Sequence, residues 1–208
     1  MQHIDTVYYI NLAHRTDRTE QFKSWLAETN VPAQKVQRID AVYIPGRGHL
    51  GATASHIKAL EEFIISGAEM CCIYEDDYAP IDIQSYWSSV QQVFDNKVEF
   101  DIVLLAYNFL KSTPTQYPFL EKVSKSYTAS GYILTRTFAP RLLENFKDAF
   151  RLAVDEESKT RRKTHNYCLD VYWAELMPTS KWYVLKPRIG KQIESYSDIE
   201  GLMTNHGV

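Results

Sequence analysis

Residues 70–77 read Met-Cys-Cys-Ile-Tyr-Glu-Asp-Asp, a short apolar run that stops abruptly at three consecutive carboxylates. The apolar part predicts a strand that is covered on both faces. Three adjacent carboxylates repel one another and stay partly desolvated at the end of such a strand, so a bound cation explains them best. We therefore expect Glu75, Asp76 and Asp77 to mark a site for a divalent ion. The alternative is an acidic turn that ends the strand in water.

Strands and helices alternate around this stretch. The elements expected in the first half are strands at 7–10 and 36–39, a helix that ends before Pro32, a helix capped by Thr53 that ends at Gly67, a helix around 86–94 and a strand at 101–106. This order predicts an α/β fold with a mostly parallel, twisted sheet flanked by helices.

The second half is expected to be less regular. Residues 108–125 contain two prolines and predict an extended excursion from the sheet. The elements expected after it are a strand at 130–135, a helix from 138 to 150, a short helix around 169–176, a strand at 181–185 and a polar tail. A chain of 208 residues suits one compact domain that spans 1–208.

The composition is that of a globular protein, with 45% hydrophobic and 24% charged residues. No apolar run is long enough to predict a transmembrane helix, although peripheral membrane contact stays open. The first residues lack the pattern of a signal peptide, so we expect a cytoplasmic location. The 3 cysteines match neither a disulfide framework nor a zinc site, and we expect them to be reduced.

The formal net charge of −3 gives no general attraction to nucleic acid, which is therefore not an expected partner. One local basic cluster consists of Lys159, Arg161, Arg162, Lys163 and His165. It is either a solvated loop or a contact for an anionic acceptor.

Five separated motifs lie along the chain. They are residues 7–12 (Val-Tyr-Tyr-Ile-Asn-Leu) with Arg15, Asp17 and Arg18, residues 51–56 (Gly-Ala-Thr-Ala-Ser-His), residues 73–77 (Ile-Tyr-Glu-Asp-Asp), residues 130–132 (Ser-Gly-Tyr) and residues 197–199 (Ser-Asp-Ile). Together they resemble glycosyltransferase family 25, which includes bacterial lipooligosaccharide galactosyltransferases and collagen galactosyltransferases. The resemblance runs from about residue 5 to residue 201. It implies a GT-A fold, which is Rossmann-like, a UDP-hexose donor and inversion at the anomeric carbon.

The acidic motif of GT-A enzymes follows the pattern D-x-D, which is Glu75-Asp76-Asp77 in this chain. The resemblance implies that Asp77 and Glu75 bind Mn²⁺ or Mg²⁺, which bridges to the donor diphosphate. Glu75 in place of aspartate leaves open whether it binds the ion through water or contacts the ribose. Asp198 or His206 from the tail is a candidate third ligand, and solvent exposure is the alternative for both.

Other polar residues are expected to bind the donor. Ligands collect at the carboxyl ends of parallel strands, where Asn11 and Asp40 would contact uracil and ribose beside Glu75 and Asp76. Arg15 or Arg18 would then reach the pyrophosphate. Ser55 and His56 are expected at a helix start, where backbone N–H groups favour an anion. Capping, loop bracing and core packing are the competing roles for these residues.

Inversion requires a carboxylate that removes the proton of the acceptor hydroxyl. Asp170 lies among apolar and aromatic residues that suit an acceptor pocket and matches an acid in the later region of the family, so it is our candidate base. A surface acid or a helix N-cap is the alternative.

These features lead us to expect a metal-dependent glycosyltransferase of glycan biosynthesis, for example of lipopolysaccharide. It would transfer galactose or glucose from UDP-galactose or UDP-glucose to a glycan, glycolipid or glycoprotein. Two alternatives are a metal-dependent phosphohydrolase or nucleotidyltransferase that uses the same carboxylates, and a non-catalytic module that binds a nucleotide sugar.

Overall fold

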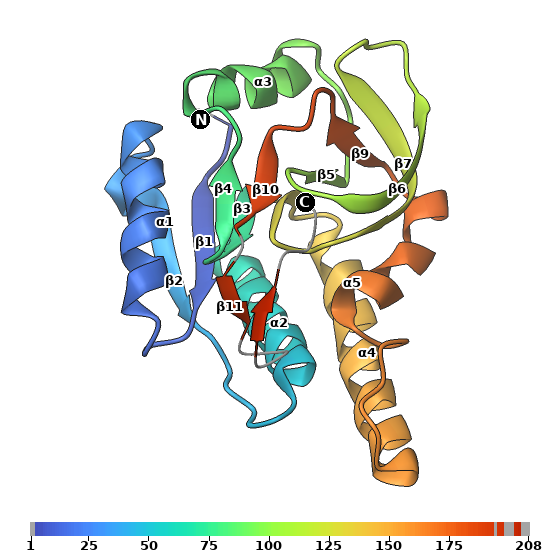
Figure 1. Ribbon diagram of the computed structural model, residues 1–208. Helices are drawn as coiled ribbons and strands as arrows, with labels where there is room; N and C mark the ends of the chain where they lie inside the picture. The colour runs from blue at the N-terminus through green and yellow to red at the C-terminus, as the bar shows by residue number, and fades with distance from the viewer. Residues whose placement is uncertain (1–2, 194, 198–201, 205–208) are drawn as a thin grey trace.

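A computed structural model describes residues 3–193, 195–197 and 202–204 of the chain, which form a sheet covered by helices on both faces (Figure 1). The main sheet has eight strands in the order β2-β1-β3-β8-β5-β9-β7-β6. Their bounds are β1 (Thr6–Asn11), β2 (Val36–Asp40), β3 (Met70–Glu75), β5 (Ile102–Leu104), β6 (Asn108–Pro114), β7 (Leu120–Tyr127), β8 (Gly131–Thr135) and β9 (Trp182–Leu185).

Most strands of this sheet share one direction. The pairings make β2, β1, β3, β5, β9 and β6 point one way, whereas β8 and β7 run against them. In register, Ile10 of β1 lies opposite Glu75 of β3, and Asn11 lies opposite Asp40 of β2. The carboxyl ends of β2, β1 and β3 therefore meet at one edge of the sheet, as expected from the sequence.

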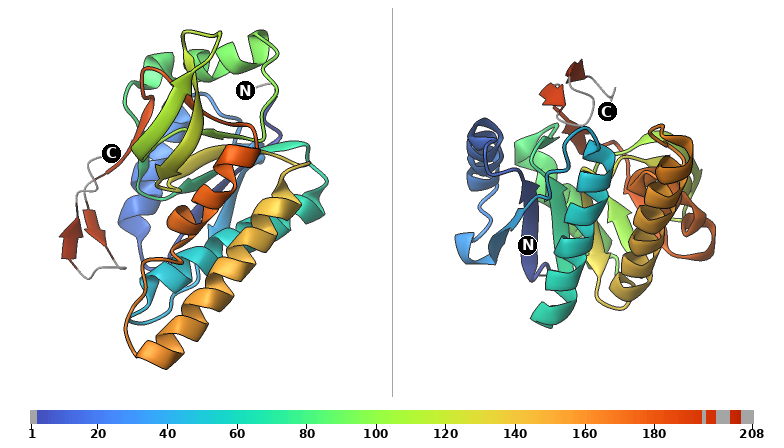
Figure 2. Two further views of the ribbon diagram at one scale, coloured as in Figure 1. Left: turned by 90° about the vertical axis from the view of Figure 1, so that its right-hand side faces the viewer. Right: turned by 90° about the horizontal axis from the view of Figure 1, so that it is seen from below.

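The helices cover the two faces unequally. Their bounds are α1 (Thr16–Glu28), α2 (Gly48–Ser66), α3 (Ile83–Asp95), α4 (Ala139–Thr160) and α5 (Leu169–Tyr172). Residues of α1 and α3 share one buried cluster with the sheet, and residues of α2, α4 and α5 share the other. Figure 2 shows α2 and α4 running side by side along their face.

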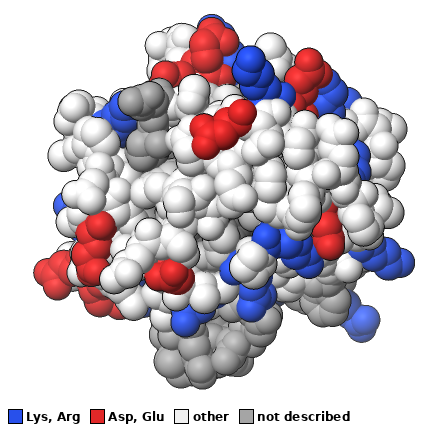
Figure 3. Space-filling view, turned by 90° about the horizontal axis from the view of Figure 1, so that it is seen from above, with Lys and Arg blue, Asp and Glu red and all other residues white. Residues whose placement is uncertain are grey.

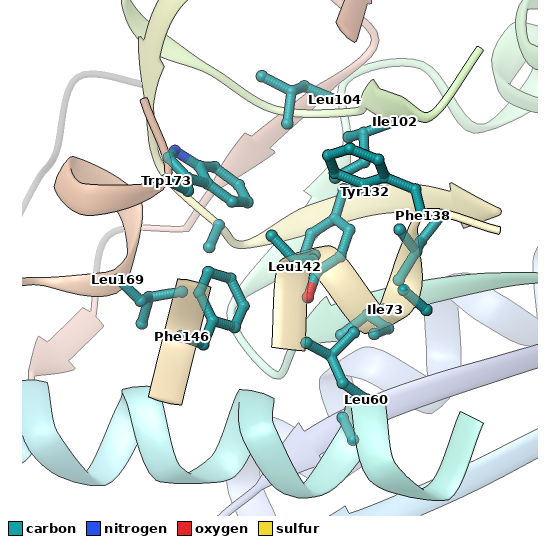
Figure 4. Packing of buried hydrophobic residues seen from close by; sticks show 14 of the residues in the cluster. Leu60, Ile73, Ile102, Leu104, Tyr132, Phe138, Leu142, Phe146, Leu169 and Trp173 are labelled. Carbon is teal, nitrogen blue, oxygen red and sulfur yellow. The ribbon is translucent and has the colours of Figure 1, made fainter. Parts of the chain in front are cut away.

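Alternation along β3 explains why both faces are covered. Cys71 and Ile73 pack under α2 and α4, whereas Cys72 and Tyr74 pack under α1 and α3. All four are fully buried, so this strand is apolar without a break until its end. Figure 4 shows the cluster under α2 and α4, in which side chains from the sheet, from these two helices and from the residues around α5 interdigitate.

Short elements complete the fold. They are β4 (Tyr78–Pro80), β10 (Gly190–Gln192), β11 (Ser195–Ser197), β12 (Leu202–Thr204), and the 3₁₀ turns Ala33–Lys35, Trp173–Glu175 and Met177–Thr179. β10 pairs antiparallel with β4, and Gln192 lies opposite Tyr78. This pairing brings β10 against the turn that contains the three carboxylates.

The predicted α/β class is confirmed, and so is the mostly parallel sheet. Two details of the prediction were wrong, and the sequence did not predict the direction of the strand at 130–135. The helix expected to start at Thr53 starts at Gly48, because residues such as Leu50 are already buried against the fold. The expected excursion at 108–125 is instead the hairpin β6–β7, which extends the main sheet. The strand at 130–135 joins the sheet antiparallel.

The surface of the described residues carries both signs of charge. The face seen in Figure 3 has acidic and basic side chains mainly toward its rim, and most of its centre is uncharged. No helix in the described ranges combines the length and apolar character needed to cross a bilayer.

Candidate active site

The turn after β3 separates the three carboxylates. Asp76 is buried and accepts hydrogen bonds from Asn11 Nδ2 at 2.7 Å and from Arg18 Nη1 at 2.8 Å. Burial raises the pKa of Asp76, and the Arg18 guanidinium and the Asn11 amide offset part of that rise. Asp76 is therefore held by protein partners, and it anchors Arg18 beside the turn.

Asp77 has one satisfied and one unsatisfied oxygen. Its Oδ2 accepts a hydrogen bond from Gln192 Nε2 at 3.1 Å and lies 3.4 Å from Arg18 Nη1. Its Oδ1 is buried and has no hydrogen-bond partner among the described residues. Burial, followed by the charge of nearby Glu75, raises the pKa of Asp77 to about 7. Such an oxygen favours a proton or a cation.

Glu75 lies between two cavities and in front of a buried histidine. Its Oε1 is 3.3 Å from Nε2 of His56, and Nδ1 of His56 is 3.0 Å from the hydroxyl of Tyr132. His56 is fully buried, whereas the side chain of Glu75 is 24% exposed. The imidazole therefore orients Glu75 from behind and leaves its other oxygen to the solvent side.

The first cavity has a volume of about 120 Å³ and lies over the carboxyl ends of β1 and β3. Its lining includes the segment 41–44 after β2, Arg18, Glu75, Asp77 and Gln192. The second cavity has a volume of about 570 Å³, and its lining includes Asp170. Glu75 and Gln192 line both cavities, so the two spaces meet at the acidic turn.

The donor set at this junction fits a hard divalent ion in part. Glu75 and Asp77 line the same cavity, and the buried Oδ1 of Asp77 has no hydrogen-bond partner within the described chain. In those ranges, no group of three or more His, Cys, Asp or Glu side chains is arranged to hold a metal. Asp198 and His206, the candidate third ligands, lie outside the described residues.

Asn11 lines the first cavity, but its side chain is occupied by the protein. Nδ2 donates to Asp76 and to the carbonyl of Arg15, and Oδ1 accepts from Thr19 and Arg38. An amide has two donors and two acceptor positions, so these contacts use its full capacity. Asn11 therefore fixes the position of Asp76, and a direct contact with uracil would have to displace one of these bonds.

Asp40 and Arg15 lie away from the cavities. Asp40 is 68% exposed and pairs with Arg38 Nη1 at 2.6 Å, and Arg15 pairs with exposed Asp17 at 2.9 Å. Neither residue lines the first or the second cavity. The structure therefore does not bring them to the donor positions expected from the sequence. Of the two candidate arginines, Arg18 is the one at the site.

Ser55 and His56 lie in the interior of α2, because this helix starts at Gly48 rather than at Thr53. Ser55 Oγ donates to the carbonyl of Gly51 at 2.7 Å and accepts from the amide of Val42 at 2.8 Å. The expected anion site at a helix start is therefore not at these residues. Ser55 supports the wall of the first cavity, and His56 supports Glu75.

Asp170 lies in the first turn of α5 and faces the second cavity. Its Oδ2 accepts a hydrogen bond from the amide of Thr128 at 3.0 Å. Burial raises the pKa of Asp170, and the Thr128 amide opposes that rise. A carboxylate with a raised pKa at a cavity wall is suited to accept a proton.

Gln192 is a site residue that sequence reasoning missed. It reaches Asp77 only because β10 pairs with β4, and a pairing across more than a hundred residues leaves no local pattern. The segment 41–44 does carry a signal in the sequence, since Pro45 and Gly46 follow it and favour irregular structure.

No protein-family model matches the sequence, and no curated protein matches it. By structure, the chain is similar to the mannose-1-phosphate geranyltransferase from Thermus thermophilus, with a TM-score of 0.56, 9% identity, and coverage of 91% of this chain and 76% of that one. It is also similar to A197 from STIV, with a TM-score of 0.54, 14% identity, and coverage of 98% and 96%. A third similar structure is a glycosyltransferase involved in the glycosylation of the major capsid of PBCV-1, with a TM-score of 0.50, 12% identity, and coverage of 86% and 80%.

The fold is GT-A-like. At these identities the similarity concerns the arrangement of the chain alone. The GT-A-like fold says nothing by itself of the substrate, which has to be argued from the side chains.

Proposed function

We propose that this chain is a metal-dependent glycosyltransferase related to glycosyltransferase family 25. It transfers a hexose, galactose or glucose, from a UDP-sugar to a hydroxyl of a glycan acceptor with inversion, and residues 1–208 act as one domain. The observation that carries this proposal is the Asp77 carboxyl at the end of a central strand. Asp77 lines the first cavity, and its buried Oδ1 has no partner in the described chain. The five family-like motifs support it.

The donor occupies the first cavity. The segment 41–44 covers the nucleoside, and Tyr43, whose side chain is 59% exposed, stacks on the uracil ring. Arg18 lies on the same wall and provides positive charge for the pyrophosphate. Asn11 and Asp76 keep Arg18 in place.

Glu75 and Asp77 would hold a divalent ion, with Asp198 as the third protein ligand. A bound Mn²⁺ or Mg²⁺ would supply positive charge to the diphosphate as it leaves. Asp77 suits this role because its buried Oδ1 has no partner among the described residues.

The acceptor occupies the second cavity, where Asp170 is the general base. The Thr128 amide orients the Asp170 carboxyl, and its raised pKa brings proton affinity closer to neutral pH. Because the two cavities meet at Glu75, the sugar of the donor lies where an acceptor hydroxyl can approach it.

A UDP-release assay over a panel of UDP-sugars, with Mn²⁺ or EDTA, tests the proposal. We expect UDP release from UDP-galactose or UDP-glucose that requires the ion and falls by at least about a hundredfold in Asp77→Asn. Glu99→Gln is the matched control, because Glu99 is an exposed carboxylate that lines neither cavity and should leave the rate unchanged. UDP binding without any turnover would instead favour a non-catalytic binding module.

A further inference from the structure

We propose that the second cavity recognises an acidic group of the acceptor, a phosphate or a carboxylate, through Lys163 and His165. This inference rests on the proposed function, because it assumes that the acceptor occupies the second cavity. It concerns a part of the cavity that neither the donor nor the base accounts for.

Two basic side chains belong to the lining of the second cavity. Lys163 and His165 follow α4 in the chain, are exposed, and line the second cavity but not the first. Within the described ranges, neither side chain makes an ion pair or a side-chain hydrogen bond. The Lys163 ammonium and the N–H group of the His165 ring are therefore available to a ligand in the second cavity. They are separate from Arg18, which lines the first cavity.

Hydrogen bonds to α4 hold the loop that carries Lys163 and His165. Thr164, the residue between them, is buried, and its amide donates to Glu157 Oε1 at 3.0 Å while its Oγ1 donates to Glu156 Oε2 at 2.8 Å. Because Thr164 turns inward, the side chains on either side of it stay at the cavity edge. The loop thus holds the backbone of Lys163 and His165 in place beside the second cavity.

Glu157 does not neutralise them. This carboxylate is 3% exposed, and besides the Thr164 amide it contacts His49 Nε2 at 2.7 Å and Arg47 Nε at 3.5 Å. The side-chain contacts of Glu157 are thus with Arg47 and His49 at the start of α2. The acids that do face the second cavity, Glu75 and Asp170, come from β3 and α5 rather than from the loop.

The second cavity is therefore lined both by acids, from β3 and α5, and by basic side chains, from the loop after α4. An acceptor with a hydroxyl at one end and an acidic group at the other fits this lining, because the hydroxyl meets Asp170 while the acid meets Lys163 and His165. A neutral acceptor would gain no ionic contact with Lys163. Opposite charge also orients the acceptor before reaction.

The test uses three soluble probes on protein saturated with UDP and Mn²⁺: glucose, glucuronate and glucose 6-phosphate. NMR titration of the protein measures the binding of each. We expect both acids to bind at least about tenfold more tightly than glucose. Comparison of the two acids tells a carboxylate site from a phosphate site.

The double variant Lys163→Gln/His165→Gln should reduce the preference for acids to about twofold or less. Lys159→Gln is the control, because Lys159 belongs to the same basic cluster but pairs with Asp155 and lines neither cavity. It should leave the preference intact. Equal binding of glucose and the acids, no binding of either acid, or equal effects of the two variants would overturn the inference.

The outcome is separable from that of the proposed function. If UDP fails to bind or no sugar is transferred, the same titrations are run without UDP. A preference for acids that depends on Lys163 and His165 would then stand while the transferase proposal falls. Ion-dependent UDP release together with indifference to acidic probes would give the reverse.

Discussion

At the scale of single residues, Asp77 is a buried carboxyl group with one oxygen that has no hydrogen-bond partner among the described residues. Its Oδ2 is satisfied by Gln192 and its buried Oδ1 is not, so the ionised form is poorly solvated in the absence of a cation. The ionised Asp77 carboxylate thus destabilises the ion-free fold, and a bound cation would remove that destabilisation. Positions of this kind are typical of functional sites.

The pH dependence of stability checks this description of Asp77 in EDTA. An unfolded aspartate has a pKa of about 3.9, and folding raises the pKa of Asp77 to about 7. The folded state binds more protons between these values, so the contribution of Asp77 to stability falls as the pH rises through that window. We predict that Asp77→Asn has a higher Tm than the wild type and that the difference grows from about pH 4 to about pH 7. A difference that is zero or shrinks with pH, measured by calorimetry, would contradict it.

Asp170 is the second residue with a testable role. Asp170→Asn keeps an oxygen that can accept from the Thr128 amide but cannot accept the hydroxyl proton. We predict unchanged UDP affinity and a rate of transfer reduced by about a hundredfold or more. Calorimetric titration with UDP and single-turnover transfer measure the two quantities. A transfer rate near that of the wild type would remove Asp170 as the base.

At the scale of elements, the first turns of α2 form part of the lining of the first cavity. A Cβ atom on Gly51 would lie 2.5 Å from the carbonyl of Val42, so the helix can approach the segment 41–44 this closely only with glycine. Ser55, one turn later, holds the amide of Val42. The helix and the segment thus act as a unit that shapes the first cavity.

Ser55→Ala tests this unit. Loss of the bond to the Val42 amide should destabilise the bound position of the segment 41–44 by about 0.5–1.5 kcal/mol. This corresponds to about a two- to tenfold weaker affinity for UDP. Ser66→Ala is the control, because Ser66 Oγ donates to the carbonyl of Phe63 at the far end of the same helix. The two variants should differ in UDP affinity, measured by calorimetry. Equal affinities would show that the segment 41–44 does not bind the nucleotide.

The elements also show how far local sequence patterns reach. β1 and β3 were predictable because their apolar runs are continuous, and the polar residues at their ends located the edge of the sheet. The start of α2 was not, since Gly48 and Gly51 argue against a helix locally and burial against the fold decides. The hairpin β6–β7 was missed because prolines suggested a loop, although Pro114 is tolerated at the strand end.

At the scale of the whole molecule, long-range pairing completes the site. The sequence located Glu75, Asp76 and Asp77, but only the tertiary structure shows that Asn11 and Arg18 take Asp76 and that Gln192 takes Asp77. Asp40 and Arg15 line neither cavity, because each forms an ion pair elsewhere, with Arg38 and Asp17. Strand ends identify an edge of a sheet, while side-chain partners decide which residues face the ligand.

Ligand binding should stabilise the molecule as a whole. With UDP and Mn²⁺ each at about 100 times its dissociation constant, we expect a rise in Tm of about 5 to 10 °C. UDP in EDTA should give a much smaller rise, and Asp77→Asn should give little with either. Differential scanning fluorimetry measures these shifts. The same rise with and without the ion would argue against a metal-linked donor site.

The most direct measurement is a crystal structure of the protein with Mn²⁺ and UDP, with anomalous diffraction used to locate the manganese. The account predicts an anomalous peak within coordinating distance of Asp77 Oδ1, with the diphosphate on the other side of the ion and uracil under residues 41–44. Manganese elsewhere, or UDP bound in the first cavity with Asp77 still without a partner, would contradict it.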